Sequence, residues 1–210
     1  MILRRAACMA ALVLLALSES FGADVVMGRY EPTQTGYTSE KLQLPIALDW
    51  EYTATKFDNN PAAPVVAGKT CYFGSGDIVY AVDIETGTLI WSYPGYPARL
   101  GGTVKATPLL DSGKIYFGAT DSNFYCLDAA TGQFKWMYPA RGAIRCSPII
   151  EDGVIFFGAD DDSLYGVKTD GERAWKPFSA RDDIATGIAV ASGKVIVSSM
   201  EMRPPPPPVL

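Results

Sequence analysis

The sequence has 210 residues, a length that permits one or two ordinary domains with a buried core. The 20 glycines, 15 prolines and 11% of aromatic residues favour short strands joined by tight turns over long amphipathic helices. The net charge of -5 leaves no excess of basic residues to neutralise phosphates, so we expect neither nucleic acid nor an anionic membrane surface as the main partner.

Residues 1–23 have the layout of a secretory signal peptide. Arg4 and Arg5 supply a positive start, residues 6–17 are mainly apolar, and residues 18–23 are mostly small or polar. A membrane anchor is the alternative, although the apolar run is shorter than the ~20 residues that a membrane-spanning helix needs. We therefore expect a bacterial protein that is exported to the periplasm or secreted, with no stable membrane span after cleavage.

Residues 24–47 are polar and rich in turn residues, and we interpret them as a lead-in segment. A repeat begins directly after them. Its marker is tryptophan, which occurs at Trp50, Trp91, Trp136 and Trp175, with intervals of 41, 45 and 39 residues. Each tryptophan is followed two or three positions later by another aromatic residue. A near-constant interval of this size is typical of proteins that are built from repeated units.

The three units at residues 64–91, 108–136 and 148–175 share one order of elements. Each starts with a proline-led run and passes through a glycine turn into an aromatic run that ends in glycine. A run centred on tyrosine and then the tryptophan run follow. This order predicts a four-stranded antiparallel sheet per unit. Because the runs are apolar at consecutive positions, both faces of each sheet need cover, which stacking around a common axis in a β-propeller supplies.

The most specific pattern is A-x-D-x-x-T-G-x-x-x-W, which leads into the last three tryptophans. The first unit matches it completely, the second departs only by Cys126 in place of alanine, and the third is one residue shorter with Lys168 in place of aspartate. In chain order the motif residues, together with the tryptophan that precedes the first unit, are Trp50, Ala81, Asp83, Thr86, Gly87, Trp91, Asp128, Thr131, Gly132, Trp136, Gly171 and Trp175.

This pattern resembles the docking motif of the pyrroloquinoline-quinone-like propeller repeats, which occur in quinoprotein dehydrogenases and in outer-membrane assembly proteins of the BamB type. The resemblance covers residues 48–202. In such propellers the tryptophan lies between adjacent blades, and the small residue at the start of the motif leaves room for it. Gly87 and Gly132 suit turns that need a positive φ, and Asp83 and Asp128 suit acceptance of backbone N–H bonds across those turns. The motif therefore specifies packing and reports no reaction.

The repeat is incomplete at both ends of the sequence. Trp50 has no other strands of its blade upstream, and a fourth unit that begins near residue 186 lacks the tyrosine and tryptophan runs. We interpret residues 203–210, which contain five prolines, as part of a blade that is cut short. A polyproline tail recognised by a groove-binding domain is the alternative. The expected fold is all-β, an incomplete propeller with about three near-complete blades and partial first and last blades.

Few residues are candidates for chemistry. The sequence has no histidine, which removes histidine metal sites and Ser-His-Asp or Cys-His catalysis. The carboxylates at 160–162 and 182–183 fall where turns are expected, so turn geometry is favoured over metal binding. Lys105 and Arg145 occupy equivalent positions ahead of the strand expected nearest the axis. Together they could bind an anion such as a quinone carboxylate; exposed loop cations are the alternative, and Ala185 at the third equivalent position favours it.

Three cysteines, Cys71, Cys126 and Cys146, lie in predicted strands beyond the signal region. Such positions favour free buried thiols, with one disulfide as the alternative.

The leading functional hypothesis is a non-catalytic binding or assembly scaffold without a demonstrable cofactor, in which a protein partner or another copy covers the open blade edges. The runner-up is the N-terminal part of an alcohol or sugar dehydrogenase that uses pyrroloquinoline quinone and calcium. A sensor domain fused to a kinase is a third option.

Overall fold

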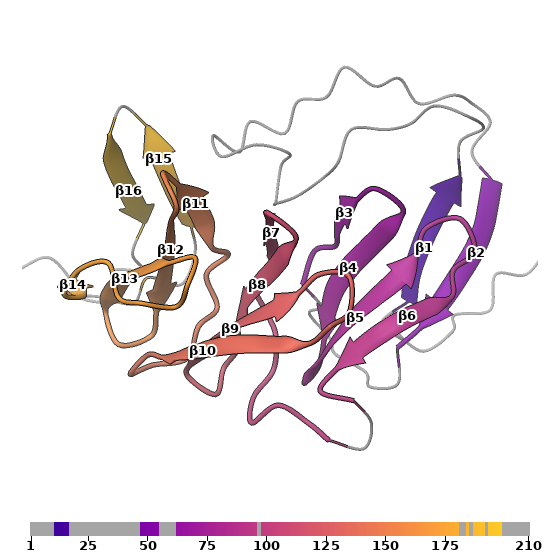
Figure 1. Ribbon diagram of the computed structural model, residues 1–210, viewed down its shortest axis with the longest axis horizontal. Coiled ribbons are helices and arrows are strands. Elements are labelled where there is room, and N and C mark those ends of the chain that lie inside the picture. Colours follow the sequence, from indigo (N-terminus) through magenta and orange to yellow (C-terminus); the bar gives the residue numbers. More distant parts are fainter. Residues whose placement is uncertain are drawn as a thin grey trace, which may run out of the picture.

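A computed structural model describes residues 11–16, 47–54, 62–95, 98–180, 184, 187–191 and 193–198. Every regular element in these ranges is a β-strand. The strands form five antiparallel sheets that follow one another along the chain in an open arc (Figure 1). The predicted all-β class and incomplete propeller are confirmed for this part of the chain.

The arc holds three four-stranded sheets between two two-stranded sheets. We call the sheet of β3 to β6 the first blade, that of β7 to β10 the second blade and that of β11 to β14 the third blade. The strands are β1 (Ala11–Ala16), β2 (Ala47–Thr53), β3 (Val65–Ala67), β4 (Thr70–Ser75), β5 (Ile78–Asp83), β6 (Leu89–Tyr93), β7 (Leu109–Asp111), β8 (Lys114–Gly118), β9 (Asn123–Asp128), β10 (Phe134–Pro139), β11 (Ile149–Glu151), β12 (Val154–Ala159), β13 (Ser163–Lys168), β14 (Phe178–Ser179), β15 (Gly187–Ala191) and β16 (Lys194–Ser198).

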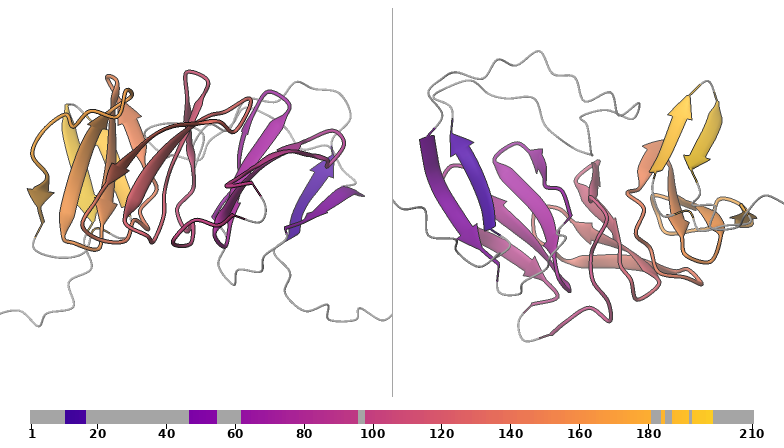
Figure 2. Two further views of the ribbon diagram at one scale, coloured as in Figure 1. Left: turned by 60° about the horizontal axis from the view of Figure 1, so that its bottom comes forward. Right: turned by 180° about the vertical axis from the view of Figure 1, so that it is seen from behind.

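Each blade is a meander in which strands that are neighbours in sequence pair with one another. The first strands β3, β7 and β11 lie toward the inside of the arc, and β6, β10 and β14 lie on its outside (Figures 1 and 2). At one end β2 pairs with β1, which falls within the expected signal region. Cleavage of that region stays a prediction. The lead-in up to residue 46, the carboxylates at 182–183 and the proline-rich end lie outside the described residues.

The core lies between blades. Between the second and third blades, the rings of Phe124 and Phe157 stack with centroids 4.2 Å apart and planes inclined by 6°. Between the first and second blades, Trp91 and Tyr72 pack in one buried cluster with Phe117 and other side chains of the second blade. Burying a side chain of this size contributes about 1.5–3 kcal/mol. The expectation that both faces of each sheet are covered is therefore met where blades adjoin.

Each blade has a glycine at the last or last but one position of its second strand, and this glycine has a specific packing role. Beside Gly118 lies Ile144, and beside Gly158 lies Ile184; both isoleucines are fully buried. A Cβ atom on either glycine would overlap its isoleucine, and one on Gly74 would stand 2.5 Å from a methyl carbon of Val104. The segment that enters the next unit thus inserts an apolar side chain where only glycine leaves room.

Replacing Gly118 by alanine therefore tests how strongly this insertion supports the fold. Because the added methyl group overlaps Ile144, we expect Gly118→Ala to lower the free energy of unfolding by about 1–3 kcal/mol, measured by urea denaturation. Gly187→Ala is the matched control, since the nearest atom to its Cβ, the Ser198 hydroxyl oxygen, is 3.7 Å away. Equal effects of the two substitutions would contradict this account of Gly118.

Candidate functional site

The docking motif folds each blade's last hairpin through its aspartate. In the first blade, Asp83 Oδ1 accepts hydrogen bonds from the backbone N–H groups of Glu85 at 2.9 Å and Thr86 at 2.8 Å, and from the Thr86 hydroxyl at 3.0 Å. Gly87 then adopts a φ of 69°, in the left-handed region that favours glycine. The aspartate and glycine of the motif thus both take part in the turn.

The second blade repeats this turn. Asp128 Oδ1 accepts from the Thr131 backbone N–H at 3.0 Å and from its hydroxyl at 2.9 Å, and Gly132 has a φ of 70°. Bonds to Thr131 and Lys135 lower the pKa of Asp128, and bonds to Thr86 lower that of Asp83, because they favour the charged carboxylate. Both aspartates therefore act as ionised acceptors within their own turns.

The first three tryptophans each dock on the turn of the following blade. The indole Nε1 atoms of Trp50, Trp91 and Trp136 donate to backbone carbonyls one blade further along the chain, those of Ile84, Ala129 and Thr169, at 2.7, 2.9 and 3.2 Å. A Cβ on Gly87, Gly132 or Gly171 would stand only 2.6–2.8 Å from the indole that lies over it. The motif glycine thus permits close approach of the indole as well as the turn, a second role that the sequence pattern alone did not show.

The third unit departs from the motif as its shorter sequence predicts. Lys168, in the position of the aspartate, pairs with Glu172 at 3.1 Å, and Gly171 closes a tight turn with a φ of 93°. Trp175 precedes the short strand β14 instead of lying within the fourth strand, and it packs directly over Gly166 of its own blade. The positions of Ala81, Cys126 and Gly166 are equivalent, and at Gly166 even one methyl group would overlap the ring.

The two cations proposed for an anion site differ in their surroundings. Arg145 Nε donates to Asp160 Oδ2 at 2.8 Å, so its charge already faces a carboxylate. Lys105 is half-buried on the equivalent segment of the preceding unit. Anion binding by Lys105 and Arg145 stays a prediction, and any anion would compete with Asp160 for Arg145.

The turn between the second and third strands uses its carboxylates locally. Asp121 Oδ2 accepts from the Tyr125 hydroxyl, and Asp161 Oδ2 accepts from the Tyr165 hydroxyl, each at 2.6 Å. Burial first, and then the bond to Asp161, raise the pKa of Tyr165 to about 12. Asp162 adopts a φ of 62°. Within the ranges that the structure describes, no three His, Cys, Asp or Glu residues are arranged to hold a metal ion.

The three cysteines beyond the signal region are free and buried, as expected. Burial raises the pKa of Cys71 and Cys126 to about 12 and that of Cys146 to about 11. The thiols are therefore protonated near neutral pH and serve as small apolar core residues.

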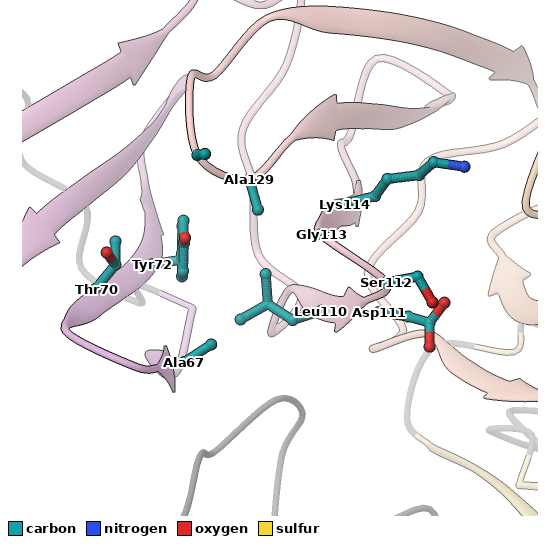
Figure 3. Close-up of a pocket in the computed structure, with 10 residues that line it drawn as sticks. Ala67, Thr70, Tyr72, Leu110, Asp111, Ser112, Gly113, Lys114 and Ala129 are labelled. Carbon is teal, nitrogen blue, oxygen red and sulfur yellow. The ribbon is translucent and has the colours of Figure 1, made fainter.

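A groove of about 500 Å³ opens between the first and second blades (Figure 3). Tyr72 and Leu110 stand on its two sides, with Thr70 beside Tyr72 and Ala129 on the motif turn of the second blade. The β7–β8 turn, residues 111–114, forms another part of its wall. The sequence pattern gave no signal for this groove, because its walls come from two different units.

The lowered pKa of Asp128 makes a prediction about pH. A carboxyl group whose pKa is lower in the folded than in the unfolded state stabilises the fold at pH values above its ordinary pKa of 3.8. This contribution is lost as the pH falls through the pKa of the folded state. We expect Asp128→Asn to be less stable than the parent at pH 7 and the difference to shrink below pH 3.8, measured by urea unfolding. Asp152→Asn, on the exposed β11–β12 turn, is the control; a difference for Asp128→Asn that does not change with pH would refute the role of the ionised carboxylate.

The family model described as "Outer membrane protein assembly factor BamB" matches residues 46–126 and 75–201, most of the chain. Quinohemoprotein alcohol dehydrogenase of Comamonas testosteroni is 35% identical over 98 residues, which cover 43% of this chain and 14% of that protein. The dehydrogenase subunit of a quinone-type alcohol dehydrogenase from Gluconobacter oxydans is 31% identical over 124 residues, which cover 56% of this chain and 16% of that subunit. The chain thus spans less than a fifth of the length of either relative.

Among solved structures, BamB from Moraxella catarrhalis has a TM-score of 0.60 at 20% identity, and the match covers 73% of this chain and 47% of that one. This likeness shows the propeller fold. The family match, which extends over residues 46–201, shows that the chain belongs to the pyrroloquinoline-quinone-like repeat propellers, in the family described as outer membrane protein assembly factor BamB.

Proposed function

We propose that the chain is a non-catalytic scaffold in the cell envelope that binds other proteins through the outer strands of its blades. The family description names outer-membrane protein assembly, and the N-terminal sequence pattern favours export. The described residues contain no helix that is long and apolar enough to cross a lipid bilayer.

The observation that carries this proposal is the outer surface formed by β6 and β10. Both strands end their sheets, so one backbone edge of each faces away from its blade. Leu89 and Ile90 on β6 are 47% and 46% exposed, and Phe134 and Met137 on β10 are 50% and 48% exposed. The Tyr93 and Phe134 rings stack at 6.4 Å, which joins the two strands into one surface. Exposed apolar side chains beside an open strand edge are suited to binding an extended segment of a partner.

The second candidate is a part of a quinoprotein dehydrogenase, which the identity of 31–35% to two such enzymes favours. That function would require pyrroloquinoline quinone and a calcium ion held by several oxygen ligands. In the described turns, one oxygen of Asp161 accepts from Tyr165 and one of Asp160 accepts from Arg145. We rank the scaffold first because the exposed outer surface supports it, whereas no group of three acidic, cysteine or histidine side chains in the described residues supports a calcium site.

The outer surface can be tested by site-specific crosslinking in the cell. We expect a photo-reactive amino acid at Met137 to form adducts with an envelope protein, because this side chain lies on the exposed part of β10. The same amino acid at Glu151, an exposed position on the inner strand β11, is the matched control. Adducts at Glu151 but none at Met137 would contradict the proposed binding surface.

The enzymatic alternative has a direct test. The purified full chain, supplied with pyrroloquinoline quinone and Ca²⁺, should give no alcohol-dependent reduction of an artificial electron-accepting dye above the rate without protein. The Comamonas testosteroni relative serves as the positive control for the assay. Dye reduction that requires both alcohol and the quinone would overturn the scaffold proposal in favour of a dehydrogenase.

A further inference from the structure

The groove between the first and second blades has a counterpart one blade further along, and the comparison indicates what the groove binds. Strand register fixes the equivalence: Thr70 pairs with Asp83, and Lys114 pairs with Asp128, so Thr70 and Lys114 occupy the same position in successive blades. Ala129 and Thr169 are also equivalent, because each directly follows the aspartate position of the motif, which is Asp128 in the second blade and Lys168 in the third. These two carbonyls accept the indole bonds of Trp91 and Trp136.

At the second gap, a lysine of the chain itself spans the space between blades. Lys114 Nζ donates to Thr169 O at 3.1 Å, and the same oxygen accepts from Trp136 at 3.2 Å. A carbonyl oxygen has two lone pairs, so one indole and one ammonium group can both bond to it. Figure 3 shows the Lys114 side chain running away from Tyr72 and Leu110, toward the far side of its blade.

At the first gap, the equivalent position offers no ammonium group. Thr70 is short and hydrogen-bonds with Tyr72. Ala129 O accepts from Trp91 at 2.9 Å, as Thr169 O does from Trp136, but the position equivalent to Lys114 holds Thr70. The preceding Lys69 pairs with Glu85 at 2.8 Å. The groove of about 500 Å³ opens at this place. We propose that it binds a lysine side chain of a partner protein, which takes the position that Lys114 takes at the second gap.

The walls and charges of the groove fit this ligand. The Tyr72 ring and the Leu110 side chain supply apolar surface for the four-carbon stem of a lysine, while the ammonium group reaches Ala129 O. Asp111 lines the groove, and Asp128 lies close enough to contribute to the raised pKa of Tyr72. Asp128 also pairs with Lys135 at 3.3 Å, and the Lys114 ammonium group at the groove wall is directed to Thr169 O. Asp111 and the net charge of -5 of the whole chain favour a basic partner. The inference rests on the proposed scaffold function and specifies the chemistry of its partner.

The test measures the binding of two blocked pentapeptides to the full chain by NMR chemical-shift titration. One peptide is Gly-Ser-Lys-Ser-Gly, and the other has norleucine in place of lysine. We expect the lysine peptide to shift the amide signals of Thr70 and Ala129 and to bind at least about fivefold more tightly than the norleucine peptide. Thr70→Lys, which places the missing lysine in the groove, should weaken binding by at least about tenfold. Ser179→Lys adds the same charge at an exposed position on β14 and should change affinity less than about twofold.

A converse variant tests the same idea by gain of binding. Lys114→Ala removes the lysine that spans the second gap, so the lysine peptide should then also shift the Thr169 amide signal. The proposal is overturned if Thr70→Lys binds the peptide as tightly as the parent, if norleucine binds equally well, or if both added lysines weaken binding equally. Adducts at Met137 that persist in the Thr70→Lys variant would leave the outer-strand scaffold intact while the groove proposal fails, so the two failures are distinguishable.

Discussion

The bond from an indole to the next blade's turn is the interaction on which the rest of the structure depends. Trp91 illustrates it: its ring lies over Gly132 and its Nε1 donates to Ala129 O at 2.9 Å. That turn keeps its shape because Asp128 holds the Thr131 N–H and hydroxyl groups. A side chain that is apolar over its face and polar at one edge can thus join two sheets and satisfy a buried donor at once. Successive blades are thereby fixed in orientation, and the buried clusters between them follow from that orientation.

The sequence allowed this part of the fold to be predicted because the interaction recurs. Tryptophans at intervals of about 40 residues and turns with aspartate and glycine are local patterns, and their physical requirements can be stated residue by residue. Even the departure of the third unit was visible, since it is one residue shorter and has Lys168 in place of aspartate, and the structure shows a tight turn there. The displacement of Trp175 from the fourth strand was not foreseen, because it depends on how the shortened turn brings the chain back across Gly166.

Contacts between different units were beyond the reach of sequence patterns. Gly118 and Ile144 are both recognisable as repeated positions, but nothing in their spacing shows that one fits against the other. Arg145 is a comparable case: its position suggested an anion site, whereas Asp160, 15 residues later, lies 2.8 Å from its Nε. The groove at Tyr72 likewise depends on two residues of different blades, Thr70 and Ala129. Such features require the relative placement of blades, which the local pattern does not contain.

A repeat protein separates the positions that hold its units together from those that are free to differ between units. A Cβ atom on the motif glycine or on the glycine near the end of the second strand would overlap a neighbouring side chain. Both glycines and the tryptophan recur in all three blades. The position of Thr70 and Lys114 is under no such restriction, since a short and a long side chain both occur there. Specific recognition in this chain is therefore expected at the rims of the gaps between blades and on the outer strands, where neighbouring units differ, and the docking turns serve to hold those differing surfaces in fixed positions.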